Sequence, residues 1–267
     1  MEATSTRPLA VVTGASSGIG YELARQFAQH GFDLLIAADS NKIETAEQQL
    51  KQLGAEVRSV QVALATYEGV EKLYQAIISA GRTVDSIAIN AGVGVSGDFV
   101  RETSLEDELN LIALNVVAPV HLTKRVAKDM VARRQGRILF TSSIAGDMPA
   151  PYEAVYGASK AFLTSFSQAI RNELKDTGVT VTALMPGATE TNFFHRAGME
   201  DTKIGSGKKD DAAEVAKEGF EALMAGKDHV VAGSFKNKLQ SLAGDVLPDA
   251  AVAQAHSKMS KPGSASK

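Results

Sequence analysis

Leu9-Ala-Val-Val-Thr13-Gly-Ala-Ser-Ser-Gly-Ile-Gly20 decides the fold of this chain of 267 residues. The apolar run predicts a strand, the glycine-rich run a tight turn, and the amphipathic stretch that follows a helix. Gly14 permits the turn, Gly18 leaves room for the backbone to approach a pyrophosphate, and Gly20 lets the helix pack on the strand. N–H groups of the first helical turn would face the phosphates. The G-x-x-x-G-x-G spacing is by itself a weak sign of nucleotide binding.

Outward from this stretch, apolar strand-like runs alternate with helical patterns. The strands are expected at Leu9–Val12, Asp33–Ala37, Glu56–Val60, Ser86–Ile89, Arg137–Phe140, Thr180–Leu184 and His229–Val231. Repeated strand-helix-strand units predict an α/β fold, a doubly wound, seven-stranded parallel sheet with helices on both faces. A left-handed, helix-ending conformation is expected at the glycines that precede strands, namely Gly31, Gly54, Gly81, Gly136 and Gly178.

The chain is expected to form one domain, because α/β folds of this size are routinely single units. We expect residues 1–7 to be flexible and residues 8–233 to form the catalytic domain. Apolar residues at mostly helical intervals predict a helical extension over residues 234–256, covering the active site or a partner subunit. Residues 257–267 are rich in serine and lysine, which predicts a disordered tail.

The composition is that of an ordinary globular protein, with 44% hydrophobic and 22% charged residues. A net charge of −3 offers no basic field for nucleic acid or an anionic membrane. Because the chain has no cysteine, it has no disulfide, thiolate nucleophile or zinc–thiolate site, and no metal is expected. No long apolar run and no signal-like start occur, so we expect a cytoplasmic protein that does not enter a membrane.

Tyr156 and Lys160 stand four residues apart, downstream of Ser143. In a helix this spacing places the phenol and the ammonium on one face. A free tyrosine has a pKa near 10, and we expect Lys160 to lower the pKa of Tyr156 by stabilising the phenolate. Ser143 would hydrogen-bond the substrate oxygen whose proton Tyr156 takes or gives. Surface helices often carry such tyrosine–lysine pairs, so the pair alone is a weak signal.

Together, Thr13–Gly20, Asn90-Ala-Gly92, Asn115, Ser143 and Tyr156–Lys160 resemble the short-chain dehydrogenase/reductase family, from about Pro8 to about Val231. The resemblance implies a Rossmann-type catalytic domain, a nicotinamide cofactor and reversible hydride transfer between an alcohol and a ketone or aldehyde, with Tyr156 as general acid and base. It implies four catalytic residues, Asn115, Ser143, Tyr156 and Lys160. The cofactor-binding residues it implies are Gly14, Ser16, Ser17, Gly18, Ile19, Gly20, Asp39, Leu64, Asn90, Ala91, Gly92, Tyr156, Lys160, Pro186, Gly187, Thr189 and Thr191.

These residues follow the first, fourth, fifth and sixth expected strands, so four loops should meet at the carboxyl edge of the sheet. In the family, Asn90 braces the central sheet, and an asparagine at position 115 holds a water that links Lys160 to solvent. Asn115 is expected inside a helix that Pro119 bends or restarts.

Two features beyond the sixth strand bear on the substrate. Thr191 resembles the threonine that binds the nicotinamide carboxamide in the family. Residues 201–211 stand where relatives carry a mobile substrate lid. Phe193, Phe194 and Met199 precede this stretch, and they either line a pocket for a hydrophobic group or belong to the core.

Cofactor choice depends on the end of the second strand, Ala37-Ala38-Asp39-Ser40. A carboxylate there accepts hydrogen bonds from the adenosine ribose and repels a 2′-phosphate. NAD-type relatives commonly carry the acid at the position of Ala38, and many NADP-preferring relatives carry arginine at that of Asp39. We expect NAD rather than NADP, although Asp39 could instead be a helix N-cap or a turn residue, which is compatible with either cofactor. Ala63 replaces the aspartate that usually meets the adenine.

Two other functions stay open at this point. One is an epimerase or dehydratase-type enzyme of the same fold, and the other is a non-catalytic dinucleotide-binding sensor. The intact serine–tyrosine–lysine trio counts against the sensor. The expected partner is a small-molecule alcohol or carbonyl substrate, and the family implies a homodimer or homotetramer. Fold analogy identifies no particular substrate.

Overall fold

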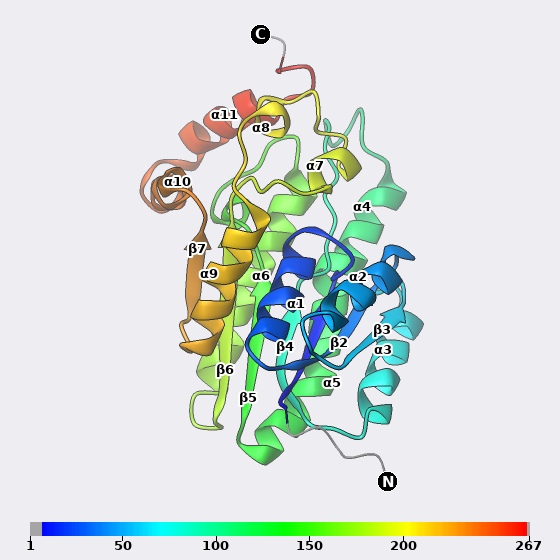
Figure 1. The fold of residues 1–267 in the computed structure, drawn as a ribbon. Helices are drawn as coiled ribbons and strands as arrows, with labels where there is room; N and C mark the ends of the chain where they lie inside the picture. The colour runs from blue at the N-terminus through cyan, green and yellow to red at the C-terminus, as the bar shows by residue number, and fades with distance from the viewer. Residues whose placement is uncertain (1–6, 266–267) are drawn as a thin grey trace.

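Seven parallel strands form one sheet in the computed structural model, which describes residues 7–265 (Figure 1). They are β1 Leu9–Thr13, β2 Asp33–Ala38, β3 Val57–Gln61, β4 Val84–Ile89, β5 Gly136–Thr141, β6 Val179–Pro186 and β7 His229–Ala232. Their order across the sheet is β3-β2-β1-β4-β5-β6-β7. The predicted doubly wound Rossmann-type sheet is therefore confirmed, and each strand lies within two residues of its expected bounds.

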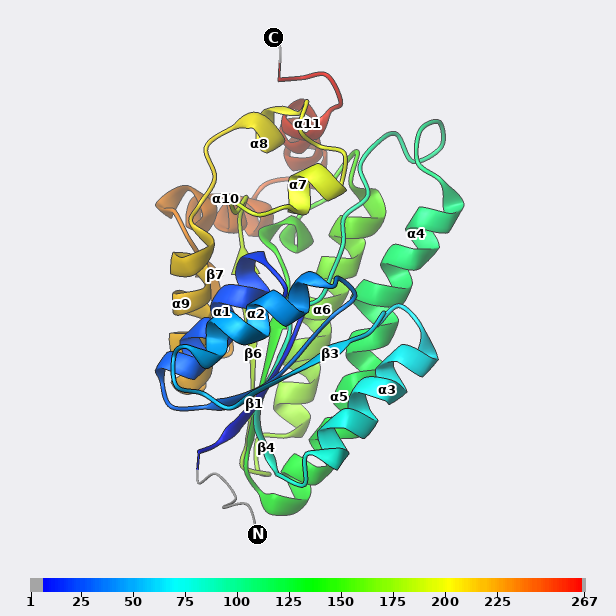
Figure 2. The ribbon, with the colours of Figure 1, turned by 45° about the vertical axis from the view of Figure 1, so that its right-hand side comes forward.

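Helices cover both faces of the sheet (Figures 1 and 2). One face carries α1 Gly18–Gln29, α2 Lys42–Lys51 and α9 Ala212–Met224, and the other carries α3 Tyr67–Ser79, α5 Ala118–Arg133 and α6 Ala154–Glu173. The remaining helices are α4 Leu105–Ile112, α7 Phe193–Arg196, α8 Lys203–Ser206, α10 Phe235–Val246 and α11 Asp249–Ser260. Both faces are thus buried at the centre of the sheet, which explains why β1 and β2 are nearly continuous apolar runs, whereas the edge strand β3 is mostly polar.

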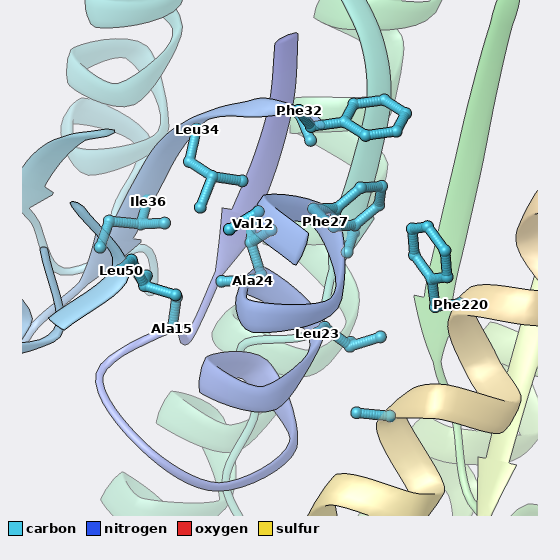
Figure 3. Close-up of a cluster of buried hydrophobic side chains, with 14 of the residues drawn as sticks. Val12, Ala15, Leu23, Ala24, Phe27, Phe32, Leu34, Ile36, Leu50 and Phe220 are labelled. Carbon is cyan, nitrogen blue, oxygen red and sulfur yellow. The ribbon is translucent and has the colours of Figure 1, made fainter. Parts of the chain in front are cut away.

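Two apolar cores fix the register of the strands. Val12 points into the core beneath α1, whereas its neighbour Val11 points into the core on the opposite face. In the first core, the ring of Phe27 meets Phe32 and Phe220 edge to face, with 5.1 Å between centroids in each pair (Figure 3). A slip of one residue would exchange the two sides of a strand, so this packing sets where each strand ends and where its following loop begins.

The order in which the chain adds strands to the sheet reverses between β1 and β4. The chain adds β2 and β3 on one side of β1 and then places β4 on the other side. Ligands of doubly wound sheets bind in the crevice that this reversal opens beyond the carboxyl ends of the strands. The fold therefore directs the search for a site to the loops after β1 and β4.

Four of the five helix-ending glycines have the expected left-handed conformation, namely Gly31, Gly54, Gly81 and Gly178. The expectation for Gly136 is wrong, because Arg134, with φ of 55°, ends α5 instead. Gly136 opens β5, and a Cβ there would lie 2.5 Å from Sδ of Met130. Its glycine serves close packing rather than a turn.

The carboxyl-terminal part of the chain is more ordered than its composition predicted. Ser257 to Ser260 complete α11, and the N–H of Ala265 donates to the carbonyl of Asp201 at 2.9 Å. The expected disordered tail is therefore wrong for residues 257–265, because tertiary hydrogen bonds hold this segment. At the other end, Arg7, the last residue of the expected flexible segment, hydrogen-bonds Gly54. Residues 1–6 and 266–267 lie outside the described residues.

Candidate active site

A cavity of about 690 Å³ opens at the carboxyl edge of the sheet. Every predicted cofactor-binding residue lines it, and so does Ser143. As predicted, the loops after β1, β4, β5 and β6 all contribute. The loops after β2 and β3 add Asp39 and residues 62–65. Asn115 is the one predicted site residue that does not line the cavity.

The glycine-rich turn forms a narrow cradle at the amino end of α1. Gly14 and Gly18 have φ of 68° and 57°, and a Cβ on Gly18 would lie 2.9 Å from Cγ2 of Thr191. A Cβ on Gly20 would lie 2.2 Å from the carbonyl oxygen of Gly14. The N-cap residue Ser17 makes no side-chain hydrogen bond to the first turn of α1. A bare backbone surface with free helical N–H groups fits the pyrophosphate of a dinucleotide.

Asp39 is the one charged residue among the cavity-lining residues that follow β2 and β3. Its side chain is exposed. Helix α2 begins after Asn41, so the alternative that Asp39 caps this helix is wrong. Leu64 is buried in the same wall, and its neighbour Ala63 brings no hydrogen-bonding side chain to it. This end of the cavity can therefore offer a ribose one carboxylate and an adenine an apolar surface.

Ser143, Tyr156 and Lys160 come together and are all buried. Tyr156 and Lys160 share one face of α6, where Nζ of Lys160 lies 5.6 Å from the centre of the tyrosine ring. Nζ also donates to the carbonyl of Thr141 at 2.9 Å. The hydroxyl of Ser143, from the loop after β5, lies close enough to that of Tyr156 to act on its pKa, and Oγ of Ser143 donates to the carbonyl of Pro186 at 3.4 Å. The backbone N–H of Ala145 donates to Oγ of Ser143 at 3.1 Å, which fixes the hydroxyl in place.

Burial is the main influence on the pKa values of Tyr156 and Lys160. Burial and then the nearby carboxylate of Glu153 raise the pKa of Tyr156, and the nearby hydroxyl of Ser143 opposes them in part. Burial alone lowers the pKa of Lys160 to about 8. The expected lowering of the tyrosine pKa is thus wrong, because desolvation of the phenolate outweighs any attraction by Lys160. The phenol is protonated at neutral pH.

Asn115 lies in the wall behind the cavity, in a π-helical turn over Ala113–Val117 that joins α4 to α5. Its Oδ1 accepts the N–H of Val93 at 3.0 Å, and its Nδ2 donates to the carbonyl of Val93 and to Oγ of Ser159. A Cβ on Gly92 would lie 3.1 Å from this Oδ1 and 3.4 Å from Nζ of Lys160. Asn115 therefore fixes the loop after β4 beside Lys160. Its role in holding a water stays a prediction.

The alternatives for the apolar residues after β6 divide between them. Met199 is buried in a small core of this segment, and Phe194 belongs to the same core and also lines the cavity. Phe193 is half-buried, lines the cavity, and places its ring 5.1 Å from that of Tyr156. Within residues 201–211, α8 spans Lys203–Ser206. The predicted mobility of this stretch stays a prediction.

Sequence reasoning missed several residues of the cavity wall. Glu153, at the N-cap of α6, lines the cavity three residues before Tyr156. From the carboxyl-terminal helices come Asn237 and Gln240 of α10 and His256 and Met259 of α11. The one sequence signal for these residues was His256, a titratable side chain among small residues at the end of the predicted helical extension. The extension therefore does cover the cavity, which was one of its two expected roles.

Comparison with known proteins agrees with this site. Residues 8–201 match the family model for short chain dehydrogenases. The chain is 33% identical over 187 residues to the oxidoreductase UcpA of Salmonella typhimurium, covering 70% of this chain and 71% of that protein.

Solved structures share the same fold. A short-chain dehydrogenase from Sphingobium yanoikuyae in complex with NADPH has a TM-score of 0.78 and 29% identity, covering 84% of this chain and 87% of that one. A 3-oxoacyl-[acyl-carrier protein] reductase from Brucella melitensis in complex with NAD has a TM-score of 0.76 and 29% identity. The match covers 88% of this chain and 99% of that one. These similar proteins include complexes with each nicotinamide dinucleotide.

Residues 7–265 offer neither a membrane-spanning helix nor a metal-binding cluster. None of the helices there combines the length and the apolar character needed to cross a membrane. No group of three or more histidine, aspartate and glutamate side chains there could hold a metal ion.

Lys160→Met tests the electrostatics of the cofactor-free protein. The ordinary pKa of lysine is 10.5 and that of folded Lys160 is about 8. The unfolded chain therefore binds more protons between these values, and Lys160 makes stability rise with pH in this window. Above pH 10 the raised pKa of Tyr156 acts in the opposite direction. We expect the unfolding free energy of wild type, relative to Lys160→Met, to rise by up to about 1.4 kcal/mol per pH unit between pH 8 and 10.

Urea denaturation across this pH range measures the difference. Lys42→Met, which replaces an exposed lysine outside the cavity, is the matched control and should run parallel to wild type. Parallel curves for wild type and Lys160→Met would show that Lys160 is not desolvated.

Proposed function

The chain belongs to the short-chain dehydrogenase family, and on that premise we propose that it is an NAD-dependent oxidoreductase acting on an alcohol and its ketone or aldehyde. The observation that carries the proposal is the meeting of Ser143, Tyr156 and Lys160 in one wall of a cavity that also holds the glycine cradle. The nicotinamide cofactor would supply hydride in reduction and accept it in oxidation.

The residues of the chain would handle the proton. The side chains of Ser143 and Tyr156 line the same cavity and lie close together, so both hydroxyls would reach one substrate oxygen. Because burial raises the pKa of Tyr156, its proton is present at neutral pH and can pass to the oxygen as the carbonyl is reduced. With a pKa of about 8, Lys160 is mostly charged at pH 7, and this charge favours the phenolate left behind. Alcohol oxidation would use the same groups in reverse.

The preference for NAD rests on Asp39. Its carboxylate at the carboxyl end of β2 would accept hydrogen bonds from a ribose and repel a 2′-phosphate. No arginine or lysine lies among the cavity-lining residues after β2 and β3 to offset that repulsion. The similar structures hold either dinucleotide, so the preference depends on this chain's own residues.

The substrate we propose carries an apolar group beside its carbonyl. The cavity walls beyond Tyr156 are rich in apolar side chains, namely Val93, Leu114, Ile144, Phe193, Ile204 and Met259. Burying a hydrocarbon group there contributes about 25 cal/mol per Å² of apolar surface. A hydrophobic ketone or secondary alcohol fits this surface better than a small polyol.

We also propose that two copies of the chain pair through α4, α5 and α6. Exposed apolar side chains gather on α4, the π-helical turn that follows it and the start of α5, namely Leu105, Leu109, Ile112, Val117 and Val120. A shallow apolar groove beside them is lined by Val155, Ala158 and Phe162 of α6. An exposed apolar patch of this kind is typical of an interface. A cytoplasmic location stays a prediction.

Tyr156→Phe tests the catalytic assignment. The variant keeps the ring against Phe193 but loses the proton donor, so we expect turnover to fall by at least about 100-fold while NADH affinity stays within about twofold. Absorbance of the reduced nicotinamide over a panel of ketones measures turnover, and fluorescence titration measures binding. Tyr152→Phe, outside the cavity, is the control. Near-normal turnover in Tyr156→Phe would refute the assignment.

The same assay separates the rival functions. Turnover of a sugar nucleotide or hydroxy acid with no net change in nicotinamide absorbance would indicate an epimerase or dehydratase. Binding of NADH without turnover of any substrate would indicate a sensor.

Asp39→Asn tests cofactor choice. A unit charge 4 Å away is worth about 1 kcal/mol even in water, so the two charges of a 2′-phosphate amount to about tenfold or more. We expect wild type to have a higher kcat/KM with NADH than with NADPH. In the variant, the ratio of these two values should be about tenfold lower. Glu44→Gln, an exposed acid on α2 outside the cavity, is the control and should leave the ratio unchanged. A wild-type preference for NADPH would contradict the prediction.

Leu109→Asp tests the proposed pairing. Leu109 is 55% exposed on α4, and a charge there should oppose burial against a second copy. Light scattering after gel filtration should show the mass falling at least by half, toward the 28.1 kDa of one chain. Ile78→Asp, at a 49% exposed position on α3, is the control. Equal masses for both variants and wild type would exclude this surface.

A further inference from the structure

A buried carboxylate, imidazole and hydroxyl join α11 to the catalytic helix. Glu153 and His256 are each 5% exposed and Ser260 is fully buried. Oε2 of Glu153 lies 3.1 Å from Nε2 of His256 and accepts the hydroxyl of Ser260 at 2.9 Å. The two α11 residues stand one helical turn apart, so both donors reach the same oxygen from one face of the helix.

The carboxylate of Glu153 would be costly to bury without these donors. Glu153 is the N-cap residue of α6, where an acidic side chain usually accepts from the first helical turn. It makes no such hydrogen bond and turns toward α11 instead. The buried face of α11 consists of Val252, His256 and Ser260, and two of these three residues hydrogen-bond Glu153. A buried charge is stable only where such partners satisfy it.

These three residue types also make hydrolytic triads, but this geometry excludes that chemistry. In a triad the two ring nitrogens of histidine contact the acid and the nucleophile separately. Here Nε2 of His256 makes both contacts, to Glu153 at 3.1 Å and to Ser260 at 3.0 Å. The imidazole cannot pass a proton between them, so the cluster holds structure rather than activating a nucleophile.

The residues after α11 bind the segment that leads into α8. The N–H groups of Gly263 and Ala265 donate to the side chain and the carbonyl of Asp201, at 2.8 and 2.9 Å. Oγ of Ser264 accepts the N–H of Lys203 at 3.0 Å. Helix α11 lies against α8 above the carboxyl edge of the sheet in both views (Figures 1 and 2). At the first of these attachments, His256 and Met259 line the cavity.

We propose that residues 249–265 form a latch that closes the substrate end of the cavity, with His256 and Ser260 as the positioning residues that fasten it to Glu153. The latch joins the start of the catalytic helix to residues 201–203, and places Met259 against the substrate's apolar group. Losing either donor leaves the carboxylate incompletely satisfied, so α11 detaches and the segment before α8 loosens with it. The effect of the latch on substrate binding rests on the proposed function, whereas its effect on the order of residues 201–205 and 263–265 does not.

Hydrogen exchange of the full-length, cofactor-free protein tests the latch without any activity. In His256→Ala and Ser260→Ala, amide exchange at residues 201–205 and 263–265 should rise about tenfold or more. Ser257→Ala, on the same helix but outside the cluster, should match wild type. His256→Gln keeps an N–H that can reach Glu153 and should recover most of the protection. Circular dichroism and NADH binding check folding. Wild-type exchange at residues 201–205 in both alanine variants would overturn the proposal.

Kinetics with NADH and acetophenone, an aryl ketone, provide the second readout. We expect KM for the ketone to rise about tenfold in His256→Ala and Ser260→Ala, kcat to fall less, and the Kd of NADH to stay within about twofold. An equal loss of NADH affinity would mean a general structural defect and would also overturn the latch. Absence of hydride transfer by wild type would refute the proposed function instead, and the exchange result would then decide on the latch alone.

Discussion

The contact between Thr13 and Asn90 is the constraint on which the rest of the site depends. Oγ1 of Thr13 accepts the N–H groups of Asn90 and Ala91, and Nδ2 of Asn90 donates to the carbonyl of Thr13, so the ends of β1 and β4 are held together. A Cβ on Gly14 or Gly20 would lie 2.9 or 2.4 Å from this Nδ2. The glycines that admit a pyrophosphate therefore also admit the amide that closes the sheet at its reversal, and the other loops are placed relative to this point.

Local pattern was sufficient to predict the sheet, and the family resemblance supplied the cofactor-binding part of the cavity wall. The strands are apolar runs between glycines, and their parallel order brings the loops that follow them to one edge. Helical spacing placed Tyr156 and Lys160 on one face of α6. Gly136 could not be predicted in this way, because its reason is a contact with Met130 and not a turn. The pKa of Tyr156 could not be predicted either, since it depends on burial and on Glu153, whose position next to the phenol the sequence does not show.

The latch escaped prediction because its partners are distant in the sequence. Glu153 and His256 are 103 residues apart, and Asp201 and Gly263 are 62 apart. Serine, lysine, proline and glycine in the last residues indicate disorder when judged by composition alone. Composition indicates the conformational entropy that is lost when such a segment becomes ordered, but it does not show the tertiary hydrogen bonds that offset this loss. Here a buried carboxylate on the catalytic helix supplies the reason for order at the end of the chain.

The same carboxylate links closure of the cavity to its chemistry. Glu153, Tyr156 and Lys160 lie within two turns of α6, and all are buried. Burial and the charge of Glu153 both raise the pKa of Tyr156 and favour the neutral phenol, which can donate a proton. Carbonyl reduction needs that donor, whereas alcohol oxidation needs added positive charge near the ring. Because α11 fixes where the Glu153 charge lies, the end of the chain bears on the pKa of Tyr156 as well as on the shape of the pocket.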